Sequence, residues 1–126
     1  MHAGWTARVL IVILAASVSG CGAIAGMTGN KAEVCDQTRD AFTDFGKRLE
    51  TLPPTDNAAW GKATTDFSAQ LDALAAKADD GDLKKAITAL AASWRTAGPQ
   101  IAEKGDVTQM TALLREQPGK LGTACG

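Results

Sequence analysis

The sequence predicts an all-α fold, an antiparallel up-down-up-down four-helix bundle closed by a terminal disulfide. Three observations favour this fold. Apolar residues after Asn30 recur at spacings of three and four, no segment alternates with the period of two that strands show, and 24 residues are alanine. The connections between the apolar stripes are short, which is typical of antiparallel neighbouring helices. We expect residues 1–20 to be a signal peptide, 21–32 a flexible tether and 33–126 the bundle domain.

The first helical segment begins after Asn30 and ends before Pro53-Pro54. Neither proline can donate a backbone hydrogen bond, and the first disfavours a helical conformation of Leu52. The second helix begins after Thr55 or Asp56, since either is a good N-cap. The stripes predicted to face the core are Val34, Cys35, Thr38, Ala41, Phe42, Phe45, Leu49 and Leu52, then Trp60, Ala63, Phe67, Leu71, Leu74, Ala75 and Ala78.

The third helix follows the turn at 79–82, where Asp82 is positioned to act as its N-cap. Gly98-Pro99 is expected to break or kink this helix, leaving a short helical turn through Lys104. Gly105-Asp106 then separates it from the fourth helix, which is expected to be interrupted at Pro118-Gly119. The stripes are Leu83, Ala86, Ile87, Leu90, Ala91 and Trp94, then Val107, Met110, Leu113, Leu114 and Leu121.

Counting outward from each turn predicts which core residues share a level of the bundle. One layer is expected to contain Phe42, Phe67, Trp94 and Leu114. Trp60 is expected in a separate layer, near Leu49 and Ile101. On the helix surfaces, the spacing of four predicts ion pairs, namely Asp44–Arg48 and Asp80–Lys84.

The first thirty residues have the composition of an export signal. Arg8 precedes an apolar run from Val9 to Val18, which spans roughly 15 Å as a helix and is too short to cross a bilayer. The next residues, Val18-Ser19-Gly20-Cys21, resemble the lipobox of bacterial lipoprotein precursors. This resemblance implies that Cys21 carries a diacylglyceryl group, that cleavage occurs before it, and that the protein is anchored by lipid to the bacterial cell membrane.

Two alternatives to lipidation remain open from the sequence. Cys21 could be a chance cysteine after an ordinary secretion signal, or the uncharged stretch 9–30 could be an uncleaved anchor. All three possibilities predict that residues 31–126 are extracytoplasmic.

The cysteine count supports a disulfide in the domain. The three cysteines are an odd number, but lipidation of Cys21 leaves Cys35 and Cys125 as a pair. In an up-down-up-down bundle, these two residues lie at the same end. A disulfide between them closes a loop of about 90 residues, for which the loop-entropy model gives roughly 4–5 kcal/mol. Two free thiols, or a thiol-based metal site with additional ligands, are the alternatives.

Composition argues against several kinds of chemistry. The one histidine is His2, inside the predicted signal peptide, so the exported chain lacks His-dependent catalytic, metal and haem sites. A formal net charge of -1 gives no basis for nucleic-acid binding. The acidic turn at 79–82 lacks the ligand spacing of a calcium loop. The carboxylate pairs Glu103/Asp106 and Asp40/Asp44 are expected on solvated faces, so we predict no catalytic residue, no metal and no cofactor.

The functional expectation is a binding, adaptor or structural role at the cell envelope, with an unknown protein or a small apolar ligand as partner. Trp60, Phe67 and Trp94 are the residues that could line an apolar ligand site, although tryptophans at helical spacing among Leu and Phe are more often core residues. A carrier of a small apolar ligand within the bundle and a carboxylate-based enzyme are the alternatives. A cavity lined by the tryptophans would favour the carrier, and a filled core with an exposed apolar patch would favour the adaptor.

Overall fold

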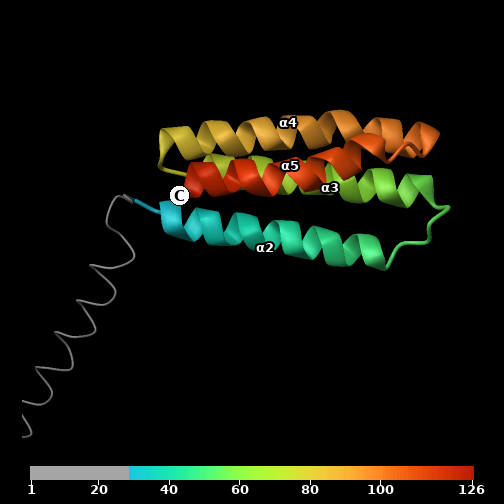
Figure 1. Ribbon diagram of the computed structural model, residues 1–126, viewed down its shortest axis with the longest axis horizontal. Coiled ribbons are helices and arrows are strands. Elements are labelled where there is room, and N and C mark those ends of the chain that lie inside the picture. The colour runs from blue at the N-terminus through green and yellow to red at the C-terminus, as the bar shows by residue number, and fades with distance from the viewer. Residues whose placement is uncertain (1–28) are drawn as a thin grey trace, which may run out of the picture.

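The chain folds into four α-helices over residues 29–126, the range that the computed structural model describes. The helices are α2 (Lys31–Glu50), α3 (Asn57–Lys77), α4 (Gly81–Lys104) and α5 (Thr108–Cys125). Figure 1 shows successive helices running in opposite directions along one long axis, with the start of α2 and the end of α5 at the same end. The predicted antiparallel up-down-up-down four-helix bundle is therefore confirmed.

The predicted signal peptide and the lipidation site at Cys21 lie outside the described residues, as does most of the predicted tether. Within residues 29–126, no helix combines the length and hydropathy that crossing a membrane requires.

Aspartates cap two of the helices. Asp56 accepts a hydrogen bond from the backbone N–H of Ala59 at 3.0 Å, which confirms one of the two predicted N-caps of α3. The N-cap predicted for α4 was wrong. Asp80, and not Asp82, accepts a hydrogen bond from the backbone N–H of Leu83 at 2.9 Å. Asp82 lies in the first turn of α4, where the helix dipole still favours a carboxylate.

The predicted helix breaks at the prolines are wrong. Pro99 lies inside α4, which continues to Lys104, and Pro118 lies inside α5, which continues to Cys125. Each proline removes one backbone hydrogen bond, but the tertiary packing of the surrounding turns keeps the helix continuous. Gly105 ends α4 as predicted, in the left-handed conformation with φ 65°.

A layer of aromatic rings fills the middle of the bundle. Phe67 contacts Phe42 and Trp94 edge to face, with ring centroids 5.0 and 5.3 Å apart, so these predicted layer members meet. Phe45 was not assigned to this layer, yet it stacks on Phe67 at 4.3 Å and contacts Trp94 at 5.1 Å. Leu114 is only half-buried against the core.

The buried indole of Trp94 has a polar partner from the neighbouring helix. Trp94 is 0% exposed and its Nε1–H donates to Oε1 of Gln117, which is 1% exposed. The amide of Gln117 in turn donates to the carbonyl of Leu90 at 3.4 Å. A buried donor without a partner would destabilise the fold, so Gln117 allows the largest side chain of the core to be fully buried.

Helices α3 and α4 form the closest interface of the bundle. A Cβ atom added to Gly61 would lie 2.5 Å from Cβ of Ala102 and 2.9 Å from the carbonyl oxygen of Gly98. Further along, Ser68 donates a hydrogen bond to the carbonyl of Ala91 at 3.0 Å. Small residues at these positions allow the two backbones to approach closely.

The predicted ion pairs are not formed. Arg48 lies 3.1 Å from Asp66 of α3 instead of pairing with Asp44, and the Asp80 carboxylate is used as the cap of α4. For Arg48, the neighbouring helix α3 provides the carboxylate in place of its own helix.

Candidate functional site

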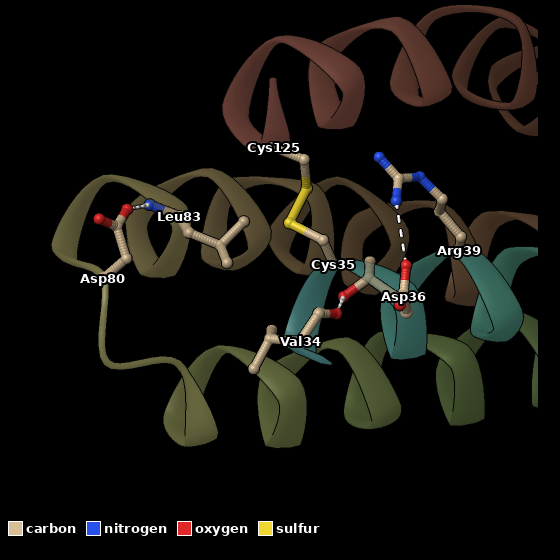
Figure 2. Close-up of a disulfide and its surroundings, with 8 residues drawn as sticks. Val34, Cys35, Asp36, Arg39, Asp80, Leu83 and Cys125 are labelled. Carbon is tan, nitrogen blue, oxygen red and sulfur yellow. Dashed lines mark hydrogen bonds and ion pairs between the residues drawn. A yellow bond between two sulfur atoms is a disulfide. The ribbon is translucent and has the colours of Figure 1, made fainter. Parts of the chain in front are cut away.

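A disulfide joins the two ends of the domain. Cys35, in the first turns of α2, is bonded to Cys125, the last residue of α5, with Cα atoms 6.0 Å apart (Figure 2). Both residues are 1% exposed. The predicted pairing is therefore confirmed. The disulfide excludes the two alternatives for these cysteines, namely free thiols and a thiol-based metal site.

The same end of the bundle has a second connection. The side chain of Asn30 donates to the carbonyl of Lys77 at 2.7 Å and accepts from the N–H of Asp79 at 2.9 Å. These bonds fix the start of α2 against the turn between α3 and α4. The chain therefore enters the domain at the end that contains the disulfide.

Beyond the disulfide, the interface between α2 and α5 has no polar connection. In the described range, neither a hydrogen bond nor an ion pair joins α2 to α5. The other helix pairs are connected: Arg48 pairs with Asp66 between α2 and α3, and Gln117 bonds Trp94 between α5 and α4. Apart from apolar contacts, α2 and α5 are thus linked by one covalent bond at one end.

A groove of about 410 Å³ lies along this interface. We call it the α2–α5 groove, and its lining residues are Arg39, Phe42, Thr43, Leu114, Pro118 and Leu121. Two of the six are charged or hydroxylated, and four are apolar. The sequence analysis assigned Phe42 and Leu114 to the core and Pro118 to a helix break, and it did not predict that they border a common space.

The groove begins about one helical turn from the disulfide. Arg39 follows Cys35 by four residues and Leu121 precedes Cys125 by four residues, so each is about 6 Å along its helix from the disulfide. The sequence indicated that these parts of α2 and α5 lie side by side, because the predicted bundle and disulfide bring them together. The rotation of the two helices about their axes, which determines which side chains border the space, was not indicated by the sequence.

The polar residues of the groove have partners of different strength. The hydroxyl of Thr43 donates to the carbonyl of Arg39 at 3.1 Å, one helical turn earlier. The Arg39 guanidinium contacts the Asp36 carboxylate at 3.3 Å (Figure 2), and the two side chains are 54% and 77% exposed. A pair that is this exposed contributes little to stability, and Arg39 is the one charged residue of the groove lining.

The three residues predicted as a ligand lining do not form one site. Phe67 and Trp94 meet in the core, where Phe67 is 2% exposed and only borders a surface hollow of about 100 Å³. Trp60 lies toward the opposite end of the bundle, with its indole N–H donating to the carbonyl of Pro53 at 2.8 Å. It lines a separate groove of about 230 Å³ with Ile101, the neighbour predicted for it.

Two surface carboxylates in residues 29–126 have a lowered pKa. Hydrogen bonds from Lys62 and Arg48 lower the pKa of Asp66, and hydrogen bonds with Thr108 lower the pKa of Asp106. Both shifts favour the charged form, and both side chains are at the surface. Residues 29–126 contain no group of three or more His, Cys, Asp or Glu side chains with the geometry of a metal site.

The fold and the site define a small, disulfide-closed, all-α bundle with an apolar groove between its first and last helices. Residues 29–126 match the family described as Domain of unknown function (DUF8711), which spans most of the chain, and the protein belongs to this family. No curated protein and no solved structure matches the chain.

Proposed function

We propose that this protein is a lipid-anchored, extracytoplasmic bundle of the bacterial cell envelope with a binding role. The observation that carries the binding role is the α2–α5 groove, an apolar surface space beside a core whose largest side chains are fully buried. Ligand sites are usually concave and apolar with few polar groups, and this description fits the groove.

The proposed location rests on the sequence motif and is supported by the disulfide. Val18-Ser19-Gly20-Cys21 resembles a lipobox, and disulfides such as Cys35–Cys125 persist mainly in oxidising compartments outside the cytoplasm. Lipidation of Cys21 gives two or more acyl chains, which is sufficient for stable anchoring. The chain enters the bundle at the disulfide end, so this end is proposed to lie nearest the membrane.

Fractionation of bacteria that express the full chain tests the anchor. The wild-type protein should be in the membrane fraction and should incorporate a clickable palmitate analogue. The Cys21→Ala variant should lose the label and the membrane association. Ser19→Ala is the matched control, because alanine is also a small residue at this lipobox position, and it should be lipidated like the wild type. A Cys21→Ala protein that remains membrane-bound contradicts the lipoprotein assignment.

A further inference from the structure

The α2–α5 groove has a charged end and an apolar end, and this polarity identifies a class of ligand. We propose that the groove binds a free fatty acid, with the carboxylate at Arg39 and the acyl chain along Phe42, Leu114 and Pro118. This inference rests on the proposed binding role of the groove and adds the chemistry of its ligand.

A filled core with an exposed apolar surface was the arrangement expected of an adaptor, but the size of this groove favours a small molecule over a protein partner. Its α5 wall extends from Leu114 to Leu121, which is about 10 Å of helix. A stable protein–protein interface usually buries about 800 Å² on each partner, far more than this length of groove presents. The volume of about 410 Å³ is within the usual range of roughly 300–1,000 Å³ for small-molecule sites.

The charge of the groove favours an anion. Arg39 is the charged residue of the lining, and a guanidinium has five N–H donors, of which the contact with Asp36 uses Nη1. Because that pair is exposed and weak, the remaining donors are available for a carboxylate, which a guanidinium binds in bidentate geometry. No acidic side chain lines the groove.

The positions of the lining residues along the helices match an amphiphile. Arg39 and Leu121 lie nearest the disulfide, whereas Phe42, Leu114 and Pro118 lie farther along the bundle. The Thr43 hydroxyl, which also faces this part, is already hydrogen-bonded to the carbonyl of Arg39. The far half of the groove is therefore suited to a hydrocarbon chain, and the charged half is at the end proposed to face the membrane, where fatty acids partition.

Photolabelling of the full chain in its native membranes tests the ligand class. The probe is dodecanoate with a diazirine near the chain end, and its adducts are mapped by peptide mass spectrometry. We expect adducts on α2 and α5 at the groove residues, with competition by excess dodecanoate. The matching diazirine-bearing dodecanol, which lacks the carboxylate, should label these peptides about tenfold less.

Two variant pairs distinguish a site from general membrane labelling. Arg39→Gln should reduce labelling about tenfold. Arg95→Gln is the control, because Arg95 of α4 is similarly exposed and is paired with Asp72 of α3, and it should leave labelling unchanged. Thr43→Trp should fill the groove and abolish labelling. Its control is Thr88→Trp, an exposed α4 threonine whose hydroxyl also bonds the carbonyl four residues earlier.

Several results would overturn the fatty-acid site. They are equal labelling by the acid and the alcohol, no effect of Arg39→Gln, adducts at the Trp60 groove instead, and competition by a lysophospholipid but not by dodecanoate. A cross-link from the groove to a second copy or to another protein, without probe adducts, also contradicts it. Failure of the lipid anchor is distinguishable, because it is read from the Cys21→Ala fractionation and not from the adduct positions.

Discussion

The α3–α4 and α2–α5 interfaces are both antiparallel helix pairs in the same bundle, yet they are stabilised in different ways. The α3–α4 interface has small residues at Gly61 and Gly98 that bring the backbones together, and a buried hydrogen bond from Ser68. The α2–α5 interface has neither; it has a terminal disulfide and a groove of about 410 Å³. One pair of helices is thus held by close packing, and the other is linked by a covalent bond beside a groove.

The largest expected effect comes from removing the disulfide. The double variant Cys35→Ser/Cys125→Ser should lose about 2–5 kcal/mol of unfolding free energy, because the bond restricts a loop of about 90 residues in the unfolded chain and holds α5 against α2. Urea unfolding of the oxidised wild type and the variant measures the difference. Reduced wild-type protein should match the variant, and an unchanged urea midpoint in either case contradicts the proposed role of the bond.

Adding a methyl group where α3 and α4 approach closely should have the next largest effect on stability. Gly61→Ala should destabilise the fold by about 1–3 kcal/mol, since the new methyl group meets Ala102 and the Gly98 carbonyl. The matched control is Gly46→Ala in α2, where a Cβ meets nothing within 4 Å. That control should stabilise by about 0.5–1 kcal/mol, as alanine is the better helix residue. If the melting temperature rises for both variants, the fold does not require the close approach of α3 and α4 at Gly61.

Removing the hydrogen bond between α5 and Trp94 should have a comparable or smaller effect on stability. Gln117→Leu preserves approximate size but leaves the Trp94 indole N–H without its acceptor, and about 1–3 kcal/mol should be lost. Gln100→Leu, at an exposed position of α4, should change the unfolding free energy by less than about 0.5 kcal/mol. If both variants have the same stability, the buried hydrogen bond does not hold α5.

The smallest effect is expected from pH. The lowered pKa of Asp66 means that its contribution is present above the unfolded value of 3.8 and is lost as pH falls through the folded pKa. With 43% of the side chain exposed, this contribution is about a few tenths of a kcal/mol and weakens in high salt. Asp66→Asn should remove it, as measured by urea unfolding across pH 3 to 6.

Between about pH 5 and 8, stability should be nearly constant, because the described domain contains no histidine. A neutral-pH transition in the unfolding free energy would contradict this expectation and would indicate a titrating group that the surface carboxylates do not provide.

Apolar spacing and the two cysteines were sufficient to predict the four helices, their directions and the disulfide. The prolines were misjudged because local propensity does not include the burial of residues on either side of them, such as Gly98 and Ile101 in α4 and Gln117 and Leu121 in α5. Asp80 and Asp82 are equivalent as sequence signals, and only the backbone geometry of the turn selects Asp80 as the cap.

The groove was not predictable in the same way. From the sequence, Trp60, Phe67 and Trp94 were core residues first and a ligand lining only as the alternative, and the structure buries Phe67 and Trp94 in the core. The lining of the α2–α5 groove depends on how far two helices separate and how each is rotated. The apolar pattern places a residue on a face but does not determine these quantities.

Hydrogen exchange of the oxidised and reduced protein tests the difference between the two interfaces most directly. Reduction of the Cys35–Cys125 bond should accelerate amide exchange in α5 and the first turns of α2, while α3 and α4 keep their protection until global unfolding. Equal loss of protection in all four helices, or an earlier loss in α3 and α4, would contradict the view that the disulfide closes the α2–α5 groove.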